Sequence, residues 1–71
     1  MKTIAQQISA LKSATESLSN FKNDSSNRGQ EIYKDYQNRI PVMIEELRAL
    51  GVNEVTHPKF KEAVVEFNYW K

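Results

Sequence analysis

Apolar residues recur along the first part of the chain with the spacing of an amphipathic helix. Successive positions are four, three, four and three residues apart: Ile4, Ile8, Leu11, Thr15 and Leu18. This is the heptad seam of a helix that packs along one side. Thr3 stands just before it and can cap the first turn by accepting a hydrogen bond from a free backbone amide. The pattern predicts a helix over about residues 3–22.

A second seam predicts a longer helix over about residues 27–50. Its members are three and four residues apart: Tyr33, Tyr36, Ile40, Met43, Leu47 and Leu50. Gly51 follows and can take the left-handed conformation that commonly ends a helix, which allows Val52 to fold back onto the last turn. Residues 23–29, NDSSNRG, form the one evident loop before this helix, because they are rich in residue types that favour turns.

Pro41 interrupts the second seam and leaves two possible structures. Proline removes the hydrogen bond to the carbonyl of Gln37 and disfavours helical backbone at Ile40, so two helices could meet here. The apolar positions before and after Pro41 nevertheless stay in phase at 100° per residue, and Pro41 lies off the stripe. We therefore favour one helix, kinked at Pro41.

A third helix is predicted over about residues 57–70. Thr56 or His57 can cap it, and Pro58 lies in the first turn, where a missing amide costs little. One face of this helix is apolar: Phe60, Ala63, Val64, Phe67 and Trp70. Val65 and Tyr69 form a second, smaller apolar strip that points away from it.

These patterns predict an all-α fold: a single domain of residues 1–71 with three helices, built on an antiparallel hairpin of the first two. The third helix covers one side of the hairpin. The predicted core is Ile8, Leu11, Leu18, Tyr36, Ile40, Met43, Leu47, Phe60, Val64 and Phe67.

The small size of the chain favours self-association. A domain of 71 residues buries too little apolar surface to be more than marginally stable by itself. It has no cysteine and one histidine, so disulfides and cysteine- or histidine-rich metal sites are excluded. A second copy of the chain is the remaining means of stabilisation, and we expect a homo-oligomer.

Charge and hydropathy narrow the range of partners. Ten Lys and Arg against nine Asp and Glu give a net charge of +1, with both signs interspersed. A nucleic-acid binder would normally show a basic stripe, so we do not expect nucleic acid as a partner. No stretch approaches the ~20 apolar residues that cross a membrane, and the N-terminus is not a secretion signal. We therefore expect a cytoplasmic protein without a membrane partner.

No catalytic, metal or cofactor site is predicted. His57 stands in a turn without a nearby nucleophile, and no GxSxG or glycine-rich phosphate loop occurs. Glu62 and Glu66 share a helix face, but a metal site needs more than two carboxylates. We expect no enzymatic activity.

Two functions from different classes remain. The first is a non-enzymatic interaction protein that binds a protein partner, or itself, through Val65 and Tyr69. The alternative is a regulator that binds an anionic small ligand such as a nucleotide, because aromatic and basic side chains lie close together in the sequence: Tyr33, Tyr36, Lys34, Arg39 and Arg28. A helix-turn-helix around residues 50–55 ranks third, since Glu62 and Glu66 stand where side chains that contact DNA should be.

Overall fold

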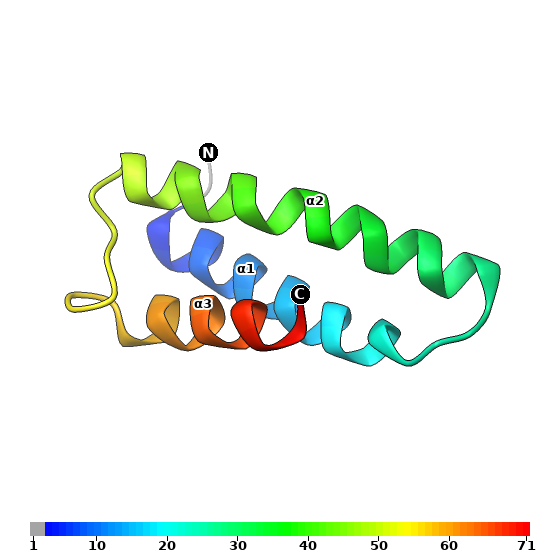
Figure 1. Cartoon of the computed structure of the whole chain (residues 1–71). Coiled ribbons are helices and arrows are strands. Elements are labelled where there is room, and N and C mark those ends of the chain that lie inside the picture. The colour runs from blue at the N-terminus through cyan, green and yellow to red at the C-terminus, as the bar shows by residue number, and fades with distance from the viewer. Residues whose placement is uncertain (1–2) are drawn as a thin grey trace.

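The computed structural model describes residues 3–71, which form three helices and no strand: α1 (Ile4–Lys22), α2 (Asn27–Ala49) and α3 (Pro58–Trp70). α1 and α2 form an antiparallel hairpin, and the chain then returns so that α3 runs alongside α1 (Figure 1). The close helix packing is that of α1 against α2 and of α1 against α3. The all-α fold built on an antiparallel hairpin is confirmed, with each boundary within about two residues of its predicted position.

Side chains cap the first two helices. Thr3 accepts a hydrogen bond from the backbone amide of Gln6 at 3.1 Å, and the Gln6 side chain accepts one from the Thr3 amide at 3.0 Å. Ser26 caps α2 with a single bond, accepting from the amide of Gly29 at 3.0 Å. The reciprocal pair at α1 and the single bond at α2 satisfy amides that each helix itself leaves free. The loop predicted over residues 23–29 was too long, because the Ser26 cap starts α2 at Asn27.

Gly29 is buried against the turn that precedes α2. A Cβ at this position would overlap the carboxylate of Asp24. That carboxylate is held in place, since Asp24 Oδ1 accepts a hydrogen bond from the Ser26 amide at 2.8 Å. Hydrogen bonds from the side chain and backbone of Ser26 lower the pKa of Asp24. The turn and the first turn of α2 therefore fit together only because residue 29 has no side chain.

α2 is continuous through Pro41, whose side chain is exposed. The prediction of one helix rather than two is confirmed. A proline on the solvent side lets the carbonyl that it frees reach water, which is why the helix tolerates it. The bend at Pro41 stays a prediction.

The C-terminus of α2 is a Schellman turn. Gly51 has φ 89°, and its amide donates to the carbonyl of Arg48 at 3.0 Å. The Val52 amide donates to the carbonyl of Leu47, also at 3.0 Å, and both of these side chains are buried. Leu50, predicted as the last seam residue, is 55% exposed, so that assignment was wrong. Val52 fills the core at this end of the helix instead.

The core lies along α1, between α2 and α3. Seven of the ten predicted core residues are buried, and Tyr36, Met43 and Val64 are only partly buried against them. Ile4, the first residue of the first seam, is exposed. The buried hydrophobic residues are Ile8, Leu11, Ala14, Leu18, Ile40, Leu47, Val52, Phe60, Ala63 and Phe67.

The molecule is flat and somewhat extended. Its principal extents are 37 × 24 × 15 Å and its radius of gyration is 12.3 Å, where about 11 Å is typical of a compact chain of this length. Because α2 and α3 pack mainly on α1, each keeps a broad outer face. These outer faces are the surfaces available to partners.

Candidate functional site

The outer face of α3 carries the predicted apolar strip. Val65 is 59% exposed and Tyr69 is 75% exposed, one helical turn apart. The Tyr69 ring lies edge-on to the ring of Trp70, with centroids 4.8 Å apart and an angle of 84° between the planes. Tyr69 therefore packs on Trp70 along one edge while most of its surface stays accessible.

Trp70 fixes the end of the chain to both other helices. Its side chain is partly buried against the core cluster that contains Phe60 and Phe67. Its backbone carbonyl accepts hydrogen bonds from the Tyr33 hydroxyl at 2.8 Å and from Lys22 Nζ at 3.0 Å. Carbonyls in the last turn of a helix have no partner within the helix, so these two bonds stabilise the terminus.

The residues predicted to bind an anionic ligand are only partly brought together. Tyr33 and Lys34 line a depression of about 250 Å³ with Phe21, Lys22, Gln30 and Gln37. Tyr36 packs against the core, Arg39 forms a 3.3 Å ion pair with Asp35, and Arg28 is exposed at the start of α2; none of these three lines the depression.

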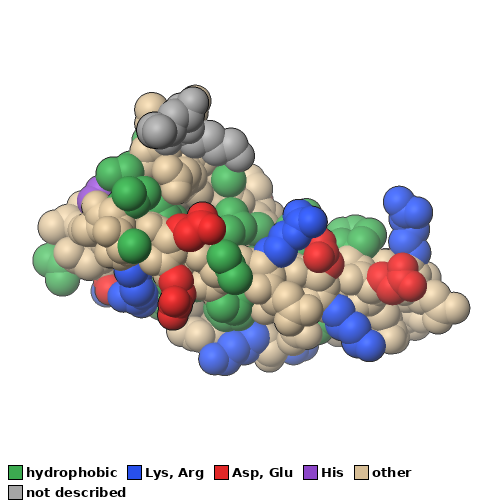
Figure 2. All heavy atoms as spheres, turned by 90° about the horizontal axis from the view of Figure 1, so that it is seen from above, with side chains coloured by type: hydrophobic (Ala, Val, Ile, Leu, Met, Phe, Trp, Pro, Cys, Tyr) green, Lys and Arg blue, Asp and Glu red, His purple; other side chains and the backbone are tan. Residues whose placement is uncertain are grey.

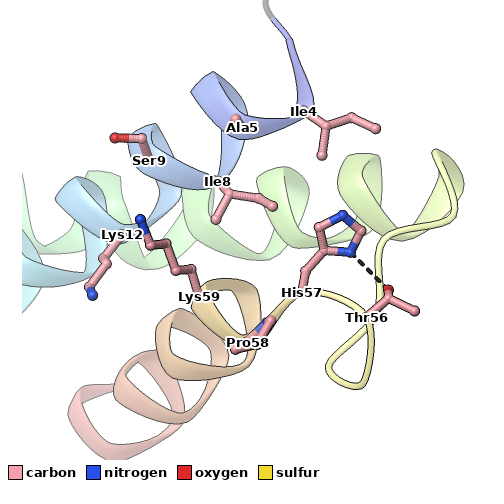
Figure 3. Close-up of a pocket in the computed structure, with 9 residues that line it drawn as sticks. All are labelled: Ile4, Ala5, Ile8, Ser9, Lys12, Thr56, His57, Pro58 and Lys59. Atoms are coloured by element: carbon pink, nitrogen blue, oxygen red, sulfur yellow. Dashed lines mark hydrogen bonds between the residues drawn. The ribbon is translucent and has the colours of Figure 1, made fainter.

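An open groove of about 640 Å³ separates the start of α1 from the start of α3. Ile4, Ala5, Ile8 and Pro58 supply its apolar surface. Its polar lining residues are Ser9, Lys12, Thr56, His57 and Lys59. Figure 3 shows these lining residues on the start of α1 and around the start of α3, with α2 behind them.

The electrostatics of the groove are positive. Lys12 Nζ lies 3.0 Å from Glu62 Oε2, and this hydrogen bond raises the pKa of Lys12. Lys59 forms no ion pair within residues 3–71. The lining residues include two lysines and no carboxylate; Lys12 has Glu62, Glu16 and Glu66 near it, so Lys59 is the lysine of the groove without a carboxylate partner among the described residues. No described side chain caps α3, and its first turn holds no acidic residue, so the positive end of the helix dipole adds to this charge.

Other polar contacts lie at or near the groove. His57 occupies the cap position of α3, as predicted, but its Nδ1 lies 2.8 Å from the Thr56 hydroxyl instead of bonding a helix amide. The buried Thr15 hydroxyl donates to the Lys12 carbonyl at 2.8 Å and lies 3.4 Å from Glu66 Oε2. Glu62 therefore bonds α3 to α1, and Glu66 contacts α1 at Thr15. Within residues 3–71 no group of three or more His, Cys, Asp or Glu could hold a metal ion.

The sequence pattern does not predict the groove. Ile4 and Ile8 belong to the predicted core-facing seam, and His57 and Pro58 to the predicted start of the third helix. The groove forms where the start of α1 meets the start of α3, two segments far apart in the sequence, so it is a property of the packing. One sequence signal was present: Ala5 extends the apolar surface beyond the Ile4–Ile8 seam, on the opposite side from Ala10 and Ala14.

The outer face of α2 is apolar and acidic toward its C-terminal end. Val42 is 56% exposed and lies beside Pro41, Glu45, Glu46 and Ala49. Figure 2, seen from the α2 side, shows hydrophobic and acidic side chains next to one another toward that end of the molecule. Neither glutamate forms an ion pair in the described part of the chain.

No protein-family model matches this chain, and no curated protein or solved structure matches it. None of the three helices, as far as residues 3–71 show, has the length and apolar character that crossing a membrane requires.

Proposed function

We propose that this chain is a non-enzymatic, cytoplasmic helical protein that acts by binding protein surfaces, including those of further copies of itself. The observation that carries the proposal is the position of Val65 and Tyr69, which are 59% and 75% exposed on the outer face of α3. A tyrosine that is oriented by a neighbouring ring and still accessible is the kind of residue that contributes most to binding at protein interfaces.

The polar contacts between the helices agree with a binding role. Glu62 pairs with Lys12 between α3 and α1 at 3.0 Å, and Glu66 lies 3.4 Å from the buried Thr15 hydroxyl. These contacts help to place α3 on α1. A face that is ordered before binding loses little conformational entropy when a partner binds.

The alternative, a regulator that binds an anionic small ligand, rests on the depression lined by Tyr33 and Lys34 together with Lys22. The two lysines would bind a phosphate or carboxylate group of the ligand. However, the Tyr33 hydroxyl and Lys22 already bond the Trp70 carbonyl, so a ligand would have to compete with these bonds. We rank it second.

An affinity pull-down from native lysate tests the two functions against each other. The bait is the tagged wild-type chain, beside a Val65→Ser/Tyr69→Ala variant and an Asn68→Ala control on the same exposed part of α3. We expect one protein to be retained by wild type and control and lost with the double variant. Retention that is equal on all three baits contradicts the role of the strip, and a co-purifying nucleotide favours the alternative.

A further inference from the structure

We propose that the groove between α1 and α3 receives the outer face of α2 from a second copy of this chain, so that copies assemble head to tail. The groove is the basic, apolar cleft of Ile4, Ala5, Ile8, Lys12, Pro58 and Lys59. We call its counterpart the α2 stripe, consisting of Pro41, Val42, Glu45, Glu46 and Ala49. The inference rests on the proposed function in that self-association is one form of the interaction proposed there.

Charge complementarity identifies the occupant. The groove holds the uncapped N-terminus of α3 and Lys59, which has no ion-pair partner within residues 3–71. The α2 stripe carries Glu45 and Glu46, which have no ion-pair partner in that range either. Carboxylates placed near Lys59 and the start of α3 would be stabilised by both the side-chain charge and the helix dipole.

The dimensions of the two surfaces also agree. The groove follows α1 from Ile4 to Lys12, about 12 Å at 1.5 Å per residue. The apolar residues of the stripe, Val42 and Ala49, are separated by about 10 Å along α2 on the same scale. Val42, Glu45, Glu46 and Ala49 stand at i, i+3, i+4 and i+7, the spacing by which a helix presents one side to a groove. Their short or flexible side chains allow close approach.

The placement of the two surfaces makes the contact heterologous. No α2 residue lines the groove, and α2 runs behind it in Figure 3, whereas the stripe lies wholly on α2. One groove–stripe contact leaves a free stripe on one copy and a free groove on the other. A head-to-tail contact therefore repeats from copy to copy until a ring closes or the chain of copies ends.

Sedimentation of the purified chain over a wide concentration range tests the proposal without any other protein. We expect the mass to rise with concentration beyond the dimer. Lys59→Glu in the groove, or Glu45→Lys with Glu46→Lys in the stripe, should each weaken association by roughly tenfold or more, because like charges then face each other. Combining all three changes in one chain should restore it.

Two matched controls exclude general effects of the substitutions. Lys34→Glu makes the same change in net charge as Lys59→Glu but lies near the other end of the molecule, and it should leave the mass unchanged. Val42→Ser should weaken association, whereas Val55→Ser, at a valine that is 89% exposed in the α2–α3 connection, should not. All of these positions are exposed, so circular dichroism should show unchanged helix content.

Three results would overturn the proposal: a monomer at every concentration, an assembly that stops at the dimer, or single charge reversals that the combined variant fails to rescue. None of them bears on the strip of Val65 and Tyr69. A monomeric chain that still captures a protein through that strip refutes this inference alone, and a growing assembly that captures nothing through the strip refutes only the role of Val65 and Tyr69.

Discussion

The hydroxyl of Tyr33 on α2 donates a 2.8 Å hydrogen bond to the backbone carbonyl of Trp70, the last residue of α3. Since α2 and α3 pack mainly on α1, this bond is one of few direct connections between them. Tyr33→Phe removes it, together with the 3.2 Å bond that the hydroxyl accepts from Gln37 Nε2, and should lower the free energy of unfolding by about 1 kcal/mol. In a domain of this size that is a fall in Tm of roughly 4–8 °C.

Tyr36→Phe is the matched control for that thermal melt. Tyr36 is partly buried on the same helix, and its hydroxyl has no hydrogen-bond partner among the described residues. Its removal should change Tm very little. Equal effects of the two substitutions would mean that the bond to Trp70 contributes nothing to stability.

Leu47 and Leu50 provide a second matched pair, three residues apart at the end of α2. Leu47 is 1% exposed, so Leu47→Ala should cost on the order of 2–5 kcal/mol through lost burial and the cavity that it leaves. For so small a domain that loss approaches the whole stability. Leu50→Ala, at a residue that is 55% exposed, should cost well under 1 kcal/mol. Urea denaturation measures both, and similar losses would contradict the observed packing.

The same pair shows what periodicity could and could not predict. The spacing of the seams was enough to predict the three helices, because burial of one face is what makes a short helix stable. Periodicity continues to the last residue of a helix, however, whereas packing ends where the partner helix ends. Leu50 lies past that point. Val52 is not part of the apolar stripe of α2, and it reaches the core only through the turn at Gly51.

At position 29 we expect alanine to give a less stable protein than glycine, the reverse of the usual preference in helices. Alanine stabilises a helix interior by about 0.5–1 kcal/mol relative to glycine. At this position its Cβ would overlap the carboxylate of Asp24 and displace it from the Ser26 amide. We expect Gly29→Ala to destabilise the wild type but to stabilise a chain that already carries Asp24→Ala. Denaturation of the four proteins of this cycle measures the coupling, and stabilisation in both backgrounds would show that Asp24 moves aside at no cost.

Acid should destabilise the fold partly through Asp24 and Glu54. Hydrogen bonds from Ser26 lower the pKa of Asp24 from its ordinary 3.8, and bonds from its own backbone and from Arg48 lower the pKa of Glu54 from 4.5. A carboxyl group with a lower pKa in the folded chain stabilises that state above its unfolded pKa. This stability is lost as the pH falls through the folded pKa.

The free energy of unfolding, measured by urea titration at a series of pH values, should therefore fall below about pH 4.5. Asp24→Asn should make the fall shallower, because it removes one of the two groups. An unchanged slope would mean that Asp24 titrates alike in the folded and unfolded chain.

The candidate surfaces were predictable to different degrees. Val65 and Tyr69 could be placed on the exposed side of α3 from helical phase alone. The contact of Tyr69 with Trp70 could not, because the edge-on geometry joins neighbouring residues that helical phase assigns to different faces. The groove was even harder to predict from the sequence, since Lys12 and Lys59 become neighbours only through the packing of two helices that are far apart in sequence.

The final prediction separates Tyr69 from Trp70. Trp70→Ala removes a partly buried ring from the core and should lower Tm at every protein concentration. Tyr69→Ala should leave helix content intact but weaken partner binding, where loss of such a residue often costs about 2 kcal/mol or more. Because the Tyr69 ring contacts Trp70, we also expect a small loss of stability, at the lower end of the ~0.5–1.5 kcal/mol typical of aromatic pairs.

Val65→Ser distinguishes lost binding from this indirect effect. It removes the other half of the strip and leaves the contact between the two rings in place. If the strip binds a partner, Val65→Ser and Tyr69→Ala should both weaken capture, and only Tyr69→Ala should shift Tm. If Tyr69→Ala alone weakens capture, in proportion to its shift in Tm, then Tyr69 acts by supporting Trp70. Wild-type capture by both variants would mean that the strip is ordinary exposed apolar surface, which every protein carries.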